Sequence, residues 1–306
     1  MTPAETTRLL KQKAADLGFE LSGATSARPS SDYSYFLDWL AKGYAGEMGY
    51  LERRKKERSD PQLLLSGAQS FFCVALSYNP QPDHYPLLEK HPISCYAWGQ
   101  DYHQVLGENL NTLTDYLCDT LRPGSLAKWY VDTAPVLERS YASQAGLGWI
   151  GKNTLLLNRT FGSFLFLGEI LTDVELAYDE PVDNLCKICT SCLDACPVGA
   201  FEEPGVLNAN KCISYLTLEH RSDFKSKVDL HGYLAGCDLC QTVCPYNANA
   251  PAGREKAFSP RPEILGLSQE KAAQMPEGDF KDFTQNSALE RVKYPMWKRN
   301  CSISRP

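Results

Sequence analysis

The sequence predicts a mixed helix-and-sheet protein, of the α/β or α+β class, with a separate cysteine-rich segment. Short apolar strands alternate with amphipathic helices through residues 1–176. Residues 177–250 are rich in cysteine and loops, and they form a second predicted unit. Prolines punctuate residues 251–306, which indicates an extended segment with short helices. We expect this last segment to pack on the core as a C-terminal extension.

The first two elements are a helix and a buried strand. Thr2 can cap the helix, Pro3 fits its first turn, and Glu5 completes a capping box. Gly18 then ends the helix. Residues 68–78 (AQSFFCVALSY) have the apolar and aromatic composition of a buried strand.

Four more elements complete the first unit. Residues 102–121 form an amphipathic helix, because their leucines recur on one side. Residues 127–132 (AKWYVD) form a short strand, and residues 135–145 form the helix after it. Residues 162–173 (GSFLFLGEILTD) read as another buried strand.

Eight of the twelve cysteines are spaced as ligands of two 4Fe-4S clusters. The first run reads C-x2-C-x2-C-x3-C-P, and a shorter run ends in the same Cys-Pro pair. In such runs the fourth cysteine ligates the other cluster. Cys212 replaces the third cysteine that the second run lacks. The predicted ligand sets are Cys186, Cys189, Cys192 and Cys244 for one cluster, and Cys196, Cys212, Cys237 and Cys240 for the other.

Zinc and disulfides are the alternatives for these cysteines. Zinc uses two C-x2-C pairs and does not need the triplet or the C-x3-C-P step. Disulfides suit small secreted domains, and this chain shows no secretory segment. Cys73 lies in an apolar stretch and is expected in the core.

Composition limits the partners. The formal net charge of −6 argues against general coating of nucleic acid, but it allows local basic patches. No apolar run approaches the roughly 20 residues of a membrane-spanning helix. The N-terminus has neither an apolar signal core nor a twin arginine. We therefore expect a cytoplasmic protein without a membrane partner, and a monomer.

Asp132 is the candidate general acid. It ends a strand and precedes a helix, where ligands tend to bind in sheet domains. Its carboxyl group could donate a proton if desolvation raised its pKa. Capping of the following helix is the more ordinary role for an aspartate at this position.

The turn Gly146-Leu-Gly-Trp-Ile-Gly-Lys-Asn-Thr is a second candidate. Its glycines allow close approach to a ligand, and its amides and lysine can meet anionic or amide groups. The spacing is not that of a P-loop. A plain structural turn explains the glycines equally well.

Two basic patches are candidates for contacts with phosphates. Residues 53–58 carry five cations in six positions, although such a run is often a solvated helix face. Near the C-terminus, Lys293, Lys298 and Arg299 are interleaved with aromatic residues. One of these, Trp297, fits the core equally well.

His103 reads as a ligand or as a polar core residue. The segment Asp101-Tyr-His-Gln-Val-Leu-Gly misses the cobalamin lower-ligand motif, D-x-H-x-x-G, by one residue. We therefore do not predict a cobalt ligand here.

Together these motifs resemble the epoxyqueuosine reductase family. The likeness extends from the N-terminus to about residue 250. The matching stretches are M-G-Y-L-E-R at 48–53, Y-A-W-G-Q-D-Y-H at 96–103, V-D-T-A-P-V-L-E-R at 131–139, G-W-I-G-K-N-T at 148–154, the cysteine runs, and C-I-S-Y-L-T-L-E-H-R at 212–221.

The resemblance implies a cobalamin-binding catalytic domain, similar to that of reductive dehalogenases, followed by a two-cluster ferredoxin-like domain. It implies reduction of the epoxide of epoxyqueuosine to queuosine at the wobble position of tRNA, the last step of queuosine biosynthesis. Cobalamin would be held without a protein lower ligand, and an external donor would supply electrons. Longer family members carry a C-terminal helical-repeat domain, which we expect to be absent from a chain of 306 residues.

The resemblance also assigns residues. Asp132 becomes the acid that protonates the leaving oxygen. Arg221 and Lys225 lie where the family meets tRNA. The positions that map to the cofactor pocket are Arg58, Tyr96, Asp132, Arg139, Lys152, Asn153, Thr154, Leu156 and Ser214.

Two other functions compete with this one. A cobalamin-dependent reductive dehalogenase would share the clusters, but such enzymes are usually exported with a twin-arginine signal. A two-cluster electron carrier would not need about 175 residues of helix and sheet before its clusters.

Overall fold

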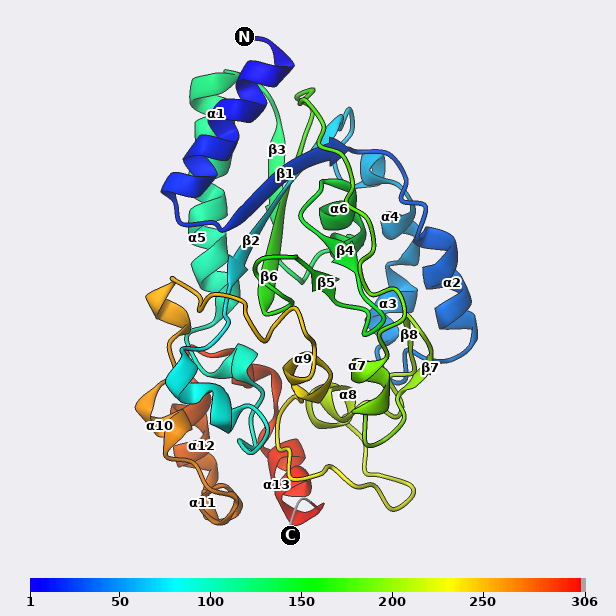
Figure 1. The fold of residues 1–306 in the computed structure, drawn as a ribbon, viewed down its shortest axis with the longest axis vertical. Helices are drawn as coiled ribbons and strands as arrows, with labels where there is room; N and C mark the ends of the chain where they lie inside the picture. The colour runs from blue at the N-terminus through cyan, green and yellow to red at the C-terminus, as the bar shows by residue number, and fades with distance from the viewer. Residues whose placement is uncertain (304–306) are drawn as a thin grey trace.

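A four-stranded antiparallel sheet lies in the upper half of the molecule in Figure 1. The computed structural model describes residues 1–303. The strands run in the order β1 (Leu21–Ser26), β2 (Ser70–Ser77), β6 (Leu165–Thr172) and β3 (Ala127–Tyr130). All three pairings are antiparallel, so the sheet is of the α+β kind among the two classes predicted.

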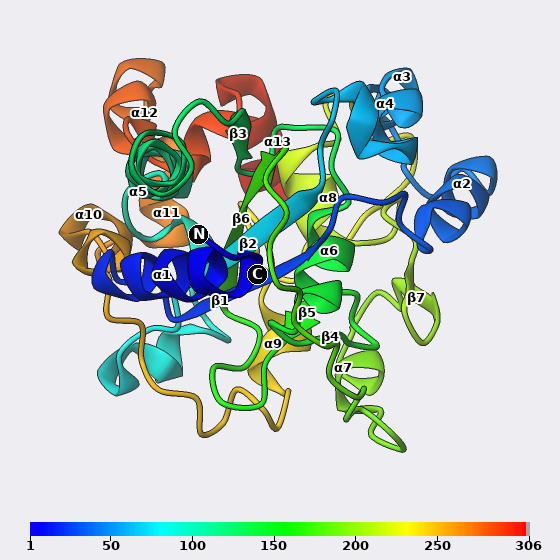
Figure 2. The same ribbon diagram turned by 90° about the horizontal axis from the view of Figure 1, so that it is seen from above.

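Helices cover both faces of this sheet (Figure 2). On one face lie α1 (Pro3–Asp16) and α5 (Tyr102–Asp115), and on the other lies α6 (Glu138–Gln144). The side chains of β2 alternate between the faces. Phe72, Val74 and Leu76 join the core under α1 and α5, while Phe71, Cys73 and Ala75 join the core under α6. The predicted core position of Cys73 is therefore confirmed.

The sequence located most of these elements but missed one. Thr2 caps α1, because its Oγ1 accepts a hydrogen bond from the Glu5 amide at 3.3 Å. The predicted helix over 102–121 comprises α5 and a π-helical turn, Tyr116–Leu121. Strand β1 (LSGATS) was not predicted, because small and polar residues give it no apolar alternation.

The elements outside the sheet, its covering helices and the C-terminal segment are short. The hairpin of β4 and β5 precedes the cysteine runs. The elements are α2 (Tyr33–Ala41), α3 (Gly49–Arg53), α4 (Lys55–Ser59), β4 (Trp149–Ile150), β5 (Leu156–Leu157), α7 (Ser191–Asp194), β7 (Phe201–Glu203), β8 (Val206–Leu207), α8 (Ile213–Leu218) and α9 (Leu239–Thr242). Short 3-10 turns lie at Pro61–Leu63, Pro82–Leu87, Cys95–Ala97, Lys256–Phe258 and Ala288–Arg291.

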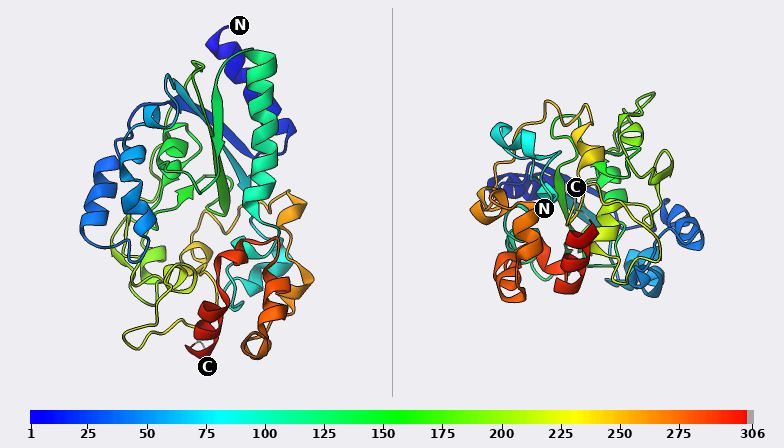
Figure 3. Two further views of the ribbon diagram at one scale, coloured as in Figure 1. Left: turned by 180° about the vertical axis from the view of Figure 1, so that it is seen from behind. Right: turned by 90° about the horizontal axis from the view of Figure 1, so that it is seen from below.

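The C-terminal segment lies at the opposite end of the molecule from the N-terminus (Figure 3). It forms α10 (Pro262–Leu265), α11 (Gln269–Gln274), α12 (Glu277–Thr284) and α13 (Tyr294–Ile303). Its apolar side chains share one cluster with residues 88–98. Trp297 is fully buried there, and its indole N–H donates to the Ala272 carbonyl at 3.1 Å. Trp297 is thus a core residue.

Within residues 1–303, every helix is too short or too polar to cross a membrane.

Candidate active site

Asp132 lies at the centre of a tight turn between β3 and α6. Its φ is 57°, a left-handed value that few residues other than glycine adopt. The Thr133 amide donates to the Val131 carbonyl across it at 2.5 Å. A three-residue turn of this hand is rare and strained. Aspartate tolerates a positive φ better than most residues, which suits its position here.

His103 links Asp132 to a second carboxylate. Asp101 caps the N-terminus of α5, because its Oδ1 accepts from the His103 amide at 2.9 Å. The same oxygen lies 2.7 Å from His103 Nδ1. The other ring nitrogen, Nε2, lies 3.5 Å from Asp132 Oδ2. Both ring nitrogens therefore face carboxylates.

This arrangement holds a proton on the imidazole. Desolvation lowers the pKa of His103, but the hydrogen bonds and negative charges of Asp101 and Asp132 outweigh it and raise the pKa to about 9. His103 is therefore an imidazolium at neutral pH.

The pKa of Asp132 moves in the other direction. Partial desolvation raises it, but the hydrogen bond and positive charge of His103 outweigh this effect, so the pKa lies below its ordinary value. The Asp132 side chain is 61% exposed, which also favours the ionised form. The donor role predicted for Asp132 from the sequence required desolvation to raise its pKa. In this structure the pKa of Asp132 is lowered instead, so that requirement is not met. The proton of the pair lies on His103.

The His103 pairing predicts a dependence of stability on pH. A pKa raised from 6.5 to about 9 on folding stabilises the folded state fully below pH 6.5, and this contribution is lost as the pH rises through about 9. We expect the difference in thermal midpoint between wild type and His103→Gln to shrink over that interval. A difference that stays constant with pH would contradict the pairing.

The C-terminal segment brings a guanidinium group to the same region. Arg291 Nε and Nη2 contact the two carboxylate oxygens of Glu219 at 2.8 and 2.5 Å. The guanidinium also lies 5.7 Å from the centre of the Tyr50 ring. Its charge helps to lower the pKa of Asp132. Sequence reasoning missed Arg291, because the basic patch predicted nearby began at Lys293 and nothing in the sequence linked this segment to Asp132.

Among the predicted pocket residues, Arg139 and Thr154 meet each other. The Arg139 guanidinium donates to the Thr154 carbonyl at 2.5 Å, which joins α6 to the turn after β4. Thr154 has a φ of 67°. Tyr96 is half-buried, and burial together with the charge of Asp132 raises the pKa of its phenol.

Lys152 and Asn153 point to the cysteine-rich loops. The Lys152 ammonium donates to the carbonyls of Lys187 and Cys189 at 2.6 and 2.8 Å. The Asn153 amide donates to the Cys240 carbonyl at 3.4 Å. These two side chains therefore connect the turn after β4 to loops from both cysteine runs.

The glycines of this turn have a structural explanation. A Cβ on Gly148 would lie 2.1 Å from the Leu157 carbonyl oxygen, and one on Gly151 would lie 2.4 Å from the Leu157 side chain. The hairpin of β4 and β5 therefore needs glycine at both positions. The structural interpretation of these glycines is therefore supported, and the contact of the turn with a ligand stays a prediction.

Of three other predicted pocket residues, two are buried and one, Ser214, is half-buried. Leu156 is 3% exposed and packs in the core under α6, which leaves only its backbone for a ligand. Arg58 is buried, with its guanidinium 5.7 Å from the Phe36 ring. Ser214 lies beside a cysteine, because its amide hydrogen-bonds to the Cys212 thiol.

The thiols of the first predicted ligand set lie within electrostatic reach of one another. Desolvation raises the pKa of Cys192 to about 11, with further increases from Cys244, Cys186 and Cys189. Desolvation also raises the pKa of Cys244, and the charges of Cys186 and Cys189 add to this increase.

The second set behaves in the same way. Desolvation raises the pKa of Cys237 to about 12, and Cys212 and Cys196 add to it. Desolvation raises the pKa of Cys240, and the charges of Cys237, Cys212 and also Cys192 of the first set raise it further. The two groups of thiols are therefore neighbours.

The number of thiols in each group fits the clusters. In a cubane each of four cysteines binds a different iron. The donor set, four thiols in each group, therefore fits two 4Fe-4S clusters.

The loop predicted to meet tRNA is held by the C-terminal segment. Arg221 and Lys225 are exposed in it. Arg299 does not face solvent as a basic patch would. Its guanidinium donates to the carbonyls of Leu216, His220 and Ser222 at 2.6 to 2.9 Å and lies 4.2 Å from the Phe224 ring. Arg299 thus anchors the loop.

The other basic patch is partly neutralised. In α3 and α4, Lys55 pairs with Glu52, and Arg54 lies 3.8 Å from Glu57. Arg53 and Lys56 are exposed on the same short helices.

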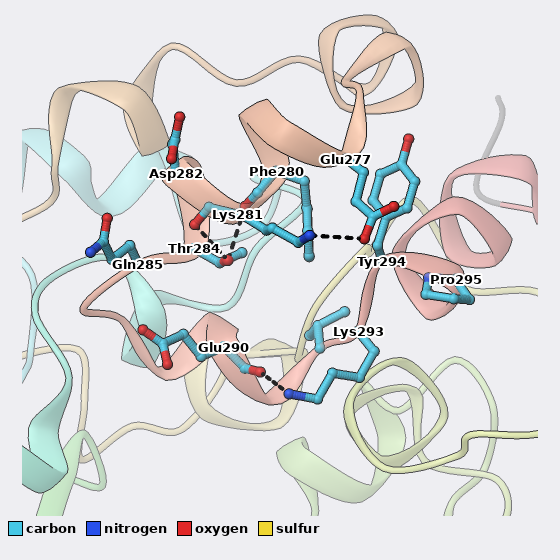
Figure 4. Close-up of a pocket in the computed structure, with 11 residues that line it drawn as sticks. Glu277, Phe280, Lys281, Asp282, Thr284, Gln285, Glu290, Lys293, Tyr294 and Pro295 are labelled. Carbon is cyan, nitrogen blue, oxygen red and sulfur yellow. Dashed lines mark hydrogen bonds and ion pairs between the residues drawn. The ribbon is translucent and has the colours of Figure 1, made fainter.

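A separate hollow of about 510 Å³ lies in the C-terminal segment, between α12 and the start of α13 (Figure 4). Its charged side chains have local partners. Lys281 pairs with Glu277 at 3.2 Å, and Lys293 donates to the Glu290 carbonyl at 3.0 Å. None of the residues assigned to the cofactor, the clusters or tRNA lines it, although Lys293 of the predicted C-terminal basic patch does.

Two family models match parts of the chain. A 4Fe-4S double cluster binding domain matches residues 185–247, and epoxyqueuosine reductase QueG, DUF1730, matches residues 58–133. Among curated relatives, an epoxyqueuosine reductase of Gloeobacter violaceus is 40% identical over 97% of this chain and 95% of its own length. The enzyme of Escherichia coli K12 is 37% identical, over 96% of this chain and 79% of its own.

Solved structures agree with this match. An epoxyqueuosine reductase crystallised with an epoxyqueuosine-modified tRNA-Tyr stem loop has a TM-score of 0.89 and 31% identity, covering 98% of this chain and 80% of that one. A Bacillus subtilis epoxyqueuosine reductase, with its aspartate catalytic loop swung out of the active site, has a TM-score of 0.87 and 30% identity, covering 98% and 81%. The reductive dehalogenase NpRdhA is similar in fold alone, with a TM-score of 0.51 and 18% identity.

The match to a double-cluster binding domain and the reductase relatives identify an oxidoreductase with iron–sulfur clusters. Its relatives narrow this class, since they match nearly the whole chain at close to 40% identity. The chain belongs to the epoxyqueuosine reductase family.

Proposed function

We propose that this protein reduces the epoxide of epoxyqueuosine in tRNA to the alkene of queuosine. The observation that carries the proposal is the Asp101–His103–Asp132 group, in a chain whose second unit matches a double-cluster domain. Conversion of an epoxide to an alkene needs both parts, because two electrons and two protons must arrive and the oxygen leaves as water.

Cobalamin is the proposed carrier of the chemistry at carbon. When bound, its reduced cobalt would supply the nucleophile for the epoxide, and the two clusters would supply electrons singly. His103 fits this proposal, because Nδ1 hydrogen-bonds to Asp101 and Nε2 faces Asp132 at 3.5 Å, and a lower ligand is not expected. Arg139, Thr154 and Tyr96 are the polar groups that we assign to the cofactor.

Asp132 and His103 are proposed to deliver the proton together. The imidazolium stores it at Nε2, facing Asp132 Oδ2. Asp132 is proposed to pass this proton to the epoxide oxygen as negative charge develops there, and Asp101 keeps the ring oriented through Nδ1. Exclusion of water by bound substrate would favour the transfer, since a carboxylate loses its solvation and its pKa rises.

The loop that carries Arg221 and Lys225 is the proposed contact with the tRNA backbone. Exposed cations on a segment fixed at its base would bind phosphates without reading sequence. We further propose that the protein is a cytoplasmic monomer supplied by an external electron donor. The division into units at about residues 176 and 250 stays a prediction.

Arg299 gives a test of the loop. Arg299→Lys keeps the charge but loses the planar fork that holds three carbonyls, so we expect weaker tRNA binding and a free energy of unfolding lower by about 1–3 kcal/mol. Filter binding and urea unfolding measure these two effects. Lys298→Ala, which removes the neighbouring exposed cation, is the matched control. An Arg299→Lys protein that binds tRNA like wild type, beside a weak Arg299→Ala protein, would indicate direct contact with phosphate instead.

The activity itself is tested with defined substrate. Protein purified without oxygen is given cobalamin, a reductant and tRNA from cells that lack this enzyme. Nucleoside mass spectrometry should show epoxyqueuosine becoming queuosine, only when all three additions are present. An intact, cluster-loaded protein that converts none of the tRNA would refute the proposed function.

A further inference from the structure

A pair of carboxyl groups lies behind the Asp132 turn. Glu138 is the first residue of α6, and Glu169 lies in the middle of β6, opposite Cys73 and Tyr130 on the adjacent strands. Glu169 is fully buried, and among the described residues neither of its oxygens meets a conventional hydrogen-bond donor. Leu165, Leu167 and Leu171 of β6 pack in the core under α6, so Glu169 faces the same side, toward Glu138 at the start of that helix. A protonated Glu169 is therefore placed to donate to the Glu138 carboxyl group.

Two carboxyl groups can hydrogen-bond only if at least one of them is protonated. An ionised carboxylate without a donor is too costly to bury, so Glu169 stays neutral. Desolvation and the charge of Glu138 raise the pKa of Glu169 far above its ordinary value. Desolvation, with the charge of Asp132, also raises the pKa of Glu138 to about 8. The pair therefore keeps a proton at neutral pH.

This pair reaches the backbone of the candidate acid. Glu138 Oε1 accepts a hydrogen bond from the Asp132 amide at 2.5 Å. That amide belongs to the residue whose φ is 57° and whose neighbours close the three-residue turn. A strained turn persists only where its surroundings over-determine it. Glu138 supplies such a constraint from the helix, and Glu169 fixes the direction of Glu138 from the sheet.

We propose that Glu138 is a positioning residue for the Asp132 turn, and that Glu169 is the buried, protonated donor that orients it. The competing explanation is that Glu138 merely stabilises the N-terminus of α6, as acidic residues in a first turn do. That role does not depend on a proton on Glu169 or on the hydrogen bond from the Asp132 amide.

Hydrogen exchange separates the two explanations without any assay of activity. We expect Glu138→Ala to speed exchange at the Asp132 amide by about fivefold or more, since a hydrogen bond is lost. Glu169→Gln keeps a neutral donor of the same shape, so it should leave this rate near that of wild type. Glu169→Leu, which has no donor, should resemble Glu138→Ala. Faster exchange confined to the amides of α6 would overturn the proposal.

Infrared spectra of protein labelled with ¹³C-glutamate test the proton directly. At a pH of about 9, above the pKa of about 8 of Glu138, wild type should still show the carbonyl band of a protonated carboxyl group, and Glu169→Gln should lose it. A wild-type spectrum with only ionised carboxylates would also overturn the proposal.

The kinetic consequence rests on the proposed function. Glu138→Ala should lower kcat by about ten- to a hundredfold with KM for tRNA unchanged, because small misplacements of a reacting group are costly. Glu169→Gln should keep most of the rate. If the pair had only a structural role, the two variants would not differ in this way. Full kcat in Glu138→Ala would remove the positioning role. If wild type itself is inactive, the proposed function fails, while the exchange and infrared results still decide the pair.

Discussion

Replacing Asp132 with asparagine is expected to lower turnover by about 10²–10⁴-fold, the range that a positioned general acid contributes. The side chain keeps its size, so the turn and the Glu138 contact to the Asp132 amide are retained. Asparagine also tolerates the φ of 57° at this position. What disappears is the carboxylate that accepts a proton from His103 and passes it on. Anaerobic single-turnover kinetics on epoxyqueuosine-containing tRNA measure the effect.

The control for this variant is Asp173→Asn. Asp173 is a carboxylate near the other end of the same pair of strands, where its Oδ1 accepts from the Leu126 amide at 2.9 Å. That variant should turn over like wild type. The iron content and tRNA affinity of Asp132→Asn should also match wild type. An Asp132→Asn enzyme with full rate would remove the proton-transfer role of Asp132 and leave the family assignment standing.

The Asp132 case shows what the sequence can and cannot predict about a site. Its position after a strand was readable from the local pattern, and the structure places it there. The direction of its pKa was not readable, because that depends on His103, which the fold brings in from another helix. The sequence around His103 differs by one residue from the cobalamin lower-ligand motif. That comparison did not indicate that His103 pairs with Asp132.

The fold shows the same division. Elements with strong periodicity or caps, such as α1 and β2, were predicted within a few residues. The antiparallel order of the sheet was not predictable, since β1 has no apolar pattern and β6 pairs with two strands far away in the chain. Arg291 and Arg299 come from the segment with the weakest pattern, and only tertiary contacts reveal what they hold.

The cysteine substitutions are expected to have the second large effect. Cys192→Ala and Cys240→Ala should each remove one cluster, lowering bound iron from about eight to about four per chain, and both should abolish turnover. The crossed ligand sets make a sharper prediction. Cys244→Ala should lose the same cluster as Cys192→Ala, and Cys196→Ala the same one as Cys240→Ala, as identified by electron paramagnetic resonance of the reduced protein.

The crossed assignment rests on contacts between segments distant in the chain. The charges of Cys186 and Cys189, more than fifty residues earlier, raise the pKa of Cys244. The charge of Cys196 raises the pKa of Cys212. Uncrossed ligation would instead pair Cys196 with the first three cysteines, so that Cys196→Ala and Cys192→Ala would lose the same cluster. Cys118→Ala, a half-buried cysteine outside both sets, should keep both clusters and full turnover. Each predicted cluster has a ligand from the other cysteine run, so neither run can bind its full cluster alone. The two clusters would therefore be adjacent, and we expect electrons to pass directly between them.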